Sequence, residues 1–182
     1  MRRGWVLSYT SILHFFKIFL GLLILQSTGS LPVMAENTSA PQETVYKKSA
    51  GMKTFSIRLK PGQDLREQLE DFIRAANIQA GFIITAVGSI NTANLRMSDE
   101  TKEIKFAGKF EIVSLVGTMS QDGLHLHISL SGKDGKVIGG HLLPGCKIHT
   151  TAEIIIGELD DLFFTREDDP ETGFKELKIY NK

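Results

Sequence analysis

The stretch Gly123–Leu143, GLHLHISLSGKDGKVIGGHLL, carries the clearest fold signal in this 182-residue chain. Leucine and isoleucine alternate with histidine and serine through its first half, which is typical of a strand with one buried face. Lys133-Asp134-Gly135 then suits a three-residue hairpin loop that is closed by a glycine in the left-handed conformation. The stretch therefore predicts two antiparallel strands joined by a tight turn.

The same loop determines which side chains face each other. Pairing of Gly132 with Lys136 sets the register of both strands. His127 then lies directly opposite His141, and His125 lies one diagonal step away. The imidazoles share one face and could hold zinc or a similar divalent ion, with metal–nitrogen distances of about 2.0–2.1 Å. Two alternatives stay open: the histidines are solvated polar residues, or a two-residue turn places His141 on the other face.

The rest of the chain indicates one helix and several further strands. Asp64 followed by Glu67 is typical of a helix start, and apolar residues recur at helical spacing from Leu65 to Asn77. We expect Gly88 to end one strand and Gly108 to separate two others. These features predict an α+β fold: a compact single domain with a mostly antiparallel sheet of about seven to eight strands and one main helix. The further expected strands are 55–59, 82–87, 95–97, 103–106, 110–119, 148–159 and 174–180.

The N-terminal residues have the features of a secretory signal peptide. Two arginines precede an apolar stretch, Val6–Leu25, and Val33 and Ala35 suit a cleavage site after Ala35. We therefore expect a periplasmic or secreted protein with no stable membrane anchor after cleavage. Alternatives are a retained anchor, since Val6–Leu25 is about long enough to span a bilayer, and a cytoplasmic protein translated from Met52. The expected organisation is a leader (1–35), a flexible polar linker (36–51) and a folded domain (52–182).

The charge balance argues against nucleic acid as a partner. The chain has 21 Lys and Arg residues and 21 Asp and Glu residues. Three of the basic residues lie in the expected leader, which contains no acid, so 18 basic residues face 21 acidic ones in the remainder. Phosphate binding needs clustered Lys and Arg, and this balance does not favour such a surface.

Five other features are candidates for a role at the site or an interface. Glu153 could fix a histidine tautomer or act as a general base, although an ion pair at the sheet rim would also explain it. Cys146, the single cysteine, excludes an intramolecular disulfide; we expect a buried thiol, with a fourth metal ligand as the alternative. His149 is expected at the surface, and Glu111 is expected to point to water, with a subunit interface as its alternative. The acidic turn 167–171 is expected to be a solvated loop.

Three motifs, in this order, closely resemble the PPC domain, the plants and prokaryotes conserved family that is also known as domain of unknown function 296. They are Gly108–Thr118 (GKFEIVSLVGT), Gly123–Ser131 (GLHLHISLS) and Gly139–Glu153 (GGHLLPGCKIHTTAE). The resemblance extends over residues 52–180. It implies a compact domain around an antiparallel sheet that assembles as a homotrimer. It also implies a zinc-like ion on three histidines, which correspond to His125, His127 and His141.

The family also includes plant members, the AT-hook nuclear-localised proteins, and the resemblance to them implies two further interactions. They bind partner proteins through a segment that corresponds to Gly108–Val113, and they carry an Arg-Gly-Arg-Pro hook that binds the DNA minor groove. The 182 residues contain no such hook, and Lys109 replaces an arginine of the plant segment. The chain therefore resembles a secreted bacterial-type member, with a protein-partner surface at Gly108–Val113.

The sequence leaves more than one class of function open. We favour a metal-binding homotrimer that acts as a binding or assembly module of unknown ligand. The alternative is a zinc-dependent enzyme on a small-molecule substrate. Three histidines would leave a coordination position for water, whose pKa zinc lowers to about 7, and Glu153 would move protons. DNA binding, by analogy with the plant members, ranks third because fold-level analogy is a weak basis for function.

Overall fold

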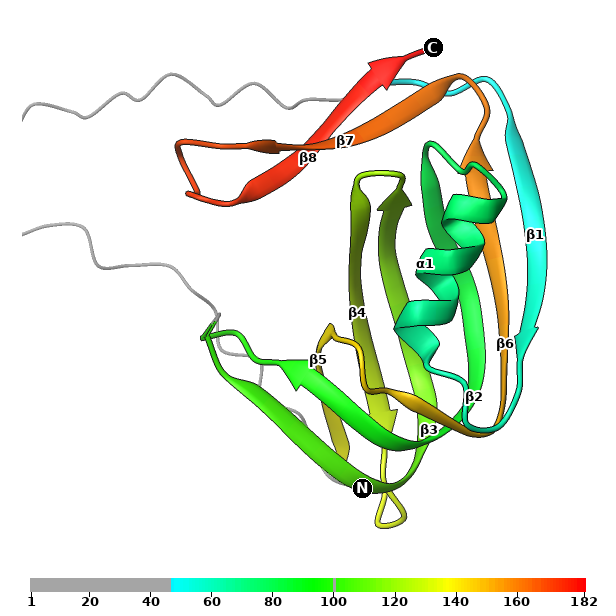
Figure 1. Ribbon diagram of the computed structural model, residues 1–182, viewed down its shortest axis with the longest axis vertical. Coiled ribbons are helices and arrows are strands. Elements are labelled where there is room, and N and C mark those ends of the chain that lie inside the picture. Colours follow the sequence, from blue (N-terminus) through cyan, green and yellow to red (C-terminus); the bar gives the residue numbers. More distant parts are fainter. Residues whose placement is uncertain (1–46, 100) are drawn as a thin grey trace, which may run out of the picture. The chain divides into compact units, whose positions relative to one another are not determined.

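The computed structural model describes residues 47–99 and 101–182. The expected leader (1–35) and residues 36–46 of the expected linker lie outside the described residues. The elements, in chain order, are β1 (Met52–Leu59), α1 (Leu65–Ala75), β2 (Gly81–Arg96), β3 (Glu103–Ser120), β4 (Gly123–Ser131), β5 (Val137–Leu142), β6 (Lys147–Leu159), β7 (Leu162–Asp168) and β8 (Lys175–Asn181) (Figure 1). Within the described ranges, no helix is both long and apolar enough to span a membrane.

Six of the strands form one antiparallel sheet in the order β1-β6-β2-β3-β4-β5, and β7 and β8 form a separate two-stranded sheet. The long strand β2 also pairs with β5, where Leu95 lies opposite Leu142 and Arg96 lies opposite His141. Strands β2 to β5 therefore curve until the first of them meets the last. This arrangement of eight strands and one helix in the described part of the chain confirms the predicted α+β fold.

Helix α1 packs its apolar stripe on the sheet. Asp64 is the N-cap, and its Oδ1 accepts hydrogen bonds from the backbone N–H groups of Arg66 and Glu67 at 3.0 and 3.1 Å. Its Oδ2 accepts a further bond from the N–H of Gly145 at 2.7 Å, which ties the helix start to the turn after β5. The buried residues of the helix are Leu65, Leu69 and Ile73.

The core lies between α1 and the six-stranded sheet, and every strand of that sheet contributes to it. On β4 the predicted alternation is observed. Leu126, Ile128 and Leu130 are buried, whereas His125 and His127 are exposed on the opposite face. Burial of these aliphatic side chains therefore fixes which face of β4 carries the histidines.

Two glycines that were expected to interrupt strands lie inside them. β2 continues through Gly88 and β3 continues through Gly108. At Gly88, where φ is +139°, an added Cβ would collide with the carbonyl oxygen of Thr151 on β6. The pairing of β2 with β6 shifts register just after this residue, as in a β-bulge. Gly88 thus permits close strand approach at an irregularity and does not end the strand.

The sequence analysis predicted no strand at β7 and placed a solvated acidic turn at 167–171. In the structure the first two residues of that stretch still belong to β7, and the turn begins after them. Glu167 and Asp168 belong to β7, which pairs with β8. The β7–β8 hairpin has its own small apolar cluster, in which Leu162 and Phe164 are buried. It also contacts the main sheet, because Arg166 Nη2 donates a hydrogen bond to Thr118 Oγ1 on β3 at 2.7 Å.

Candidate metal centre

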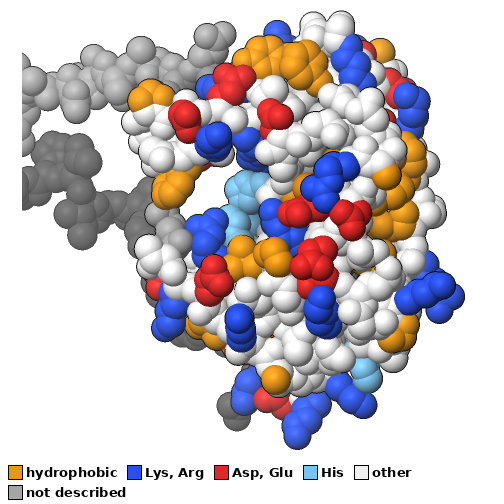
Figure 2. Space-filling view, viewed as in Figure 1, with side chains coloured by type: hydrophobic (Ala, Val, Ile, Leu, Met, Phe, Trp, Pro, Cys, Tyr) orange, Lys and Arg blue, Asp and Glu red, His pale blue; other side chains and the backbone are white. Residues whose placement is uncertain are grey.

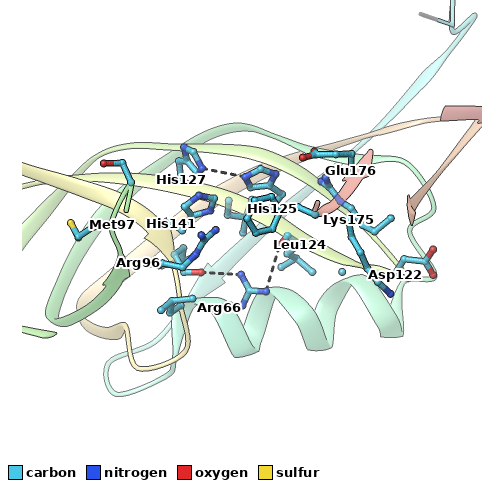
Figure 3. A pocket seen from close by; sticks show the side chains of 17 residues that line it. Arg66, Arg96, Met97, Asp122, Leu124, His125, His127, His141, Lys175 and Glu176 are labelled. Atoms are coloured by element: carbon cyan, nitrogen blue, oxygen red, sulfur yellow. Dashed lines mark hydrogen bonds between the residues drawn. The ribbon is translucent and has the colours of Figure 1, made fainter. Parts of the chain in front are cut away.

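Three histidines from two neighbouring strands converge on the outer side of the sheet. His125 and His127 lie on β4, and His141 lies on β5. One nitrogen of each ring lies within 4.8 Å of the other two. The Nε2 atoms of His125 and His127 are 3.2 Å apart, and the ring centroids of His127 and His141 are 4.1 Å apart (Figure 3).

The hairpin loop sets this arrangement as the sequence predicted. The N–H of Gly132 donates to the carbonyl of Lys136 at 2.9 Å, and Gly135 has a φ of +77°. His127 consequently pairs with His141. The three-residue loop and the register predicted from it are confirmed, and the two-residue turn is excluded.

The residues present fit a divalent metal ion. Two nitrogens that each lie about 2.05 Å from a tetrahedral ion are about 3.3 Å apart. The 3.2 Å separation of the Nε2 atoms of His125 and His127 is close to that value. One nitrogen of His141 lies within 4.8 Å of both, and a rotation of its side chain would have to shorten that separation for all three to reach one ion. The donor set is of the kind that zinc accepts.

The surroundings favour the neutral form of two of these imidazoles, His141 and His125. Burial, with smaller contributions from the neighbouring His127 and Arg96, lowers the pKa of His141 to about 4. His125 is exposed as a whole, but partial desolvation of its ring lowers its pKa, with a smaller contribution from Arg166. A neutral imidazole has the free lone pair that a metal ligand requires. Both rings are therefore ready to bind a cation at neutral pH.

The cluster lies in a pocket of about 730 Å³. Figure 2 shows histidine side chains within a hollow that has Lys and Arg side chains around it. The walls come from α1, the ends of β2 and β5, strand β4 and the β7–β8 hairpin. A pocket of this volume is of the size that accommodates a small molecule.

Three arginines line this pocket, and sequence reasoning did not select any of them. Arg96 ends β2 and pairs with His141. Arg66 lies in the first turn of α1, where its guanidinium donates to the carbonyl of Leu142 at 2.9 Å. Arg166 reaches the pocket from β7. Only long-range pairing brings these side chains to the histidines, so no local pattern in the sequence could have identified them.

The other candidate residues lie outside the cluster. Glu153 is exposed on β6 and faces Arg58 of β1. Cys146 is fully buried, and its Sγ accepts a hydrogen bond from the N–H of Asn94 at 3.3 Å. Burial raises the pKa of this thiol to about 11. His149 is half-buried on β6, and Glu111 is exposed on β3.

A family model for the Plants and Prokaryotes Conserved (PCC) domain matches residues 46–160. This chain belongs to the PCC-domain family. The resemblance seen in the sequence motifs is confirmed, and the matched residues include all three histidines of the cluster. The β7–β8 hairpin follows the matched stretch.

The curated relatives that this chain matches are longer proteins, of which the match covers a small part. The chain is 42% identical over 142 residues to the bifunctional protein GlmU of a Synechococcus strain, which covers 78% of this chain and 22% of that protein. It is 28% identical over 119 residues to AT-hook motif nuclear-localized protein 13 of Arabidopsis thaliana, which covers 59% of this chain and 27% of that protein. The chain thus spans about a quarter or less of the length of these relatives.

Solved structures from bacteria and archaea share the PCC fold. A hypothetical protein from Salmonella has 35% identity and a TM-score of 0.73, with 76% of this chain and 99% of that chain covered. A protein from Archaeoglobus fulgidus described as metal-containing has 31% identity and a TM-score of 0.63, with 75% of this chain and 99% of that chain covered.

Proposed function

We propose that this PCC-domain protein is a metal-binding module that holds one zinc-like divalent ion on His125, His127 and His141. The observation that carries the proposal is the convergence of three imidazole nitrogens within 4.8 Å of one another on adjacent strands. The lowered pKa values of His141 and His125 and the similarity to a metal-containing archaeal protein support it. The bound ion would serve a binding or assembly role for a ligand still to be found.

A binding role is favoured over catalysis by the position of Glu153. This residue was the candidate for moving protons in a zinc enzyme. It is exposed on β6 opposite Arg58, and it is not among the residues that line the pocket. Glu153 is therefore not positioned to act as an acid–base partner at the three-histidine site.

Elemental analysis of protein purified from metal-replete medium tests the metal site. We expect up to one zinc or similar ion per chain. The double variant His127→Ala/His141→Ala should lose it, because one remaining imidazole cannot hold the ion. The matched control is His149→Ala, which removes a histidine outside the cluster and should retain the metal. Metal-free wild type, or full retention in the double variant, would refute the site.

We also propose that the chain assembles as a homotrimer through the outer face of β2 and β3. Four large aliphatic side chains are exposed on these adjacent strands: Ile84, Val87, Val113 and Val116. Such a patch is typical of an interaction surface, and it overlaps the proposed partner segment Gly108–Val113. Light scattering coupled to size exclusion should give a trimer that Val113→Lys disrupts. Val137→Lys is the control, because Val137 is equally exposed on β5. A wild-type monomer would contradict this proposal.

Export of the mature chain is a separate proposal that rests on residues 1–35. Mass spectrometry of the native protein should find an N-terminus at or near Glu36 in a periplasmic or secreted fraction. An intact N-terminus at Met1 in membranes would favour the retained anchor. A start at Met52 in the cytoplasm would favour the shorter translation product.

A further inference from the structure

The pocket around the histidines carries more positive than negative charge. Four basic side chains line it, against two acidic ones: Arg66, Arg96, Arg166 and Lys175 against Asp122 and Glu176. Arg66 also forms an ion pair with Glu70, at 2.9 Å between Nε and Oε1. A divalent ion on three neutral imidazoles would add two further positive charges.

Two of these arginines flank the histidine cluster from opposite sides. Arg96 lies directly opposite His141 in the β2–β5 pairing. Arg166 donates to Thr118, and Thr118 lies directly opposite His125 in the β3–β4 pairing. Both guanidinium groups are therefore held beside the metal ligands by the strands that carry them. Figure 3 shows Arg96 next to His141.

The position of these charges is unfavourable for a metal ion alone. Both arginines are half-buried, and burial lowers the pKa of Arg166, so water screens its charge poorly. Their charges repel a dication at the histidines. A bound anion would relieve this repulsion, and a guanidinium is suited to hold a carboxylate or phosphate through paired N–H groups.

We propose that the pocket binds a small oxyanion, a carboxylate or a phosphate group, beside the metal ion. Arg96 and Arg166 would form ion pairs with this oxyanion. This inference rests on the proposed metal site. The volume of about 730 Å³ leaves room for the organic part of such a ligand, and Phe174 of the hairpin provides an apolar surface in the lining. Arg166 and Phe174 line the pocket from the C-terminal hairpin, which follows the stretch that the family model matches, so this hairpin would contribute to the choice of ligand.

Thermodynamic linkage makes the coupling reciprocal: a metal ion that raises the affinity for the oxyanion is itself bound more tightly when the oxyanion is present. The test uses the full chain loaded with Co²⁺, whose visible absorption reports nitrogen coordination. Calorimetric titrations with succinate and with inorganic phosphate distinguish the two oxyanion classes, and glycerol is the neutral probe. The same titrations are repeated on protein treated with a chelator.

Four variants complete the experiment. Arg96→Gln and Arg166→Gln remove the proposed anion contacts, and each should weaken binding of the preferred oxyanion by about tenfold or more. Arg166→Lys keeps the charge, so it should retain part of the affinity. The matched control is Arg58→Gln, which removes the same charge on β1, outside the pocket lining. Circular dichroism and thermal melts identify any variant that fails to fold.

The expected result is a cobalt spectrum that succinate or phosphate perturbs, with binding weakened by both glutamine variants and unchanged in Arg58→Gln. A normal cobalt spectrum with no binding of either oxyanion, or equal binding in all variants, overturns the inference and leaves the metal site intact. Absence of the cobalt spectrum overturns the proposed metal site itself, and this inference with it.

Discussion

His127 of β4 lies directly opposite His141 of β5, and their ring centroids are 4.1 Å apart. This contact depends on the length of the hairpin loop and on the alignment of β4 with its other neighbour, β3. Each neighbour fixes one part of the cluster: β5 supplies His141, while β3 determines where the backbone of His125 lies. Substitutions away from the histidines should therefore alter metal binding through strand position.

Gly117 offers the sharpest test of that dependence. It has a φ of +140°, and an added Cβ would collide with the carbonyl oxygen of His125. Gly117→Ala should therefore push β4 away from β3, lower the melting temperature and weaken metal binding. Gly123→Ala is the matched control, because Gly123 has a φ of +132° but no atom within 4 Å of its added Cβ. Both changes strain the backbone at a cost of about 1–3 kcal/mol, so only the additional loss in Gly117→Ala is diagnostic. Equal metal affinity in the two variants would contradict the account.

The stability of the metal-free protein should depend on pH through His141. Its pKa in the folded protein is about 4, below the ordinary histidine value of 6.5, because burial and nearby positive groups disfavour the charged ring. The unfolded chain therefore binds more protons between these values, and folding loses stability as the pH falls from about 6.5 to about 4. Chemical denaturation across this range should show a smaller decline for His141→Gln than for wild type. Identical slopes would show that His141 does not contribute.

Cys146 should be structural and unreactive. Burial raises its pKa to about 11, and the thiolate is the reactive form, so the folded protein should react with a thiol reagent at pH 8 only slowly. Denaturant should expose the thiol and give complete labelling. Cys146→Ala should lower stability while leaving the metal content unchanged. Loss of metal in this variant would revive the alternative that Cys146 is a fourth ligand.

The predictable parts of the structure are those specified by residues close together in the chain. Asp64 caps α1 as the sequence indicated, because a cap involves only the next turn of backbone. The histidine hairpin is similar, since Gly135 and the alternation on β4 set its register locally. The breaks expected at Gly88 and Gly108 were wrong because a glycine can serve either a turn or a close strand approach. Only the neighbouring strand distinguishes these two uses.

The composition of the site beyond its histidines depends on long-range contacts. Arg96 lies 45 positions before His141 in the sequence and reaches it only because β2 continues far enough to pair with β5. Arg166 reaches the pocket on β7, a strand that follows β6 after a short turn and was not predicted. Glu153 was selected for its proximity in sequence to the motif, yet it lies on another strand opposite Arg58. Sequence proximity was therefore a poor guide to the surroundings of the cluster.

The central claim, that the three histidines bind one divalent ion, is tested most directly by anomalous diffraction. Crystals of the purified protein would be measured on both sides of the zinc absorption edge, or the cobalt edge after cobalt loading. We expect one anomalous peak per chain, surrounded by nitrogens of His125, His127 and His141 at about 2.0–2.1 Å. No peak at this position in metal-loaded crystals, or a peak held by other residues, would contradict it.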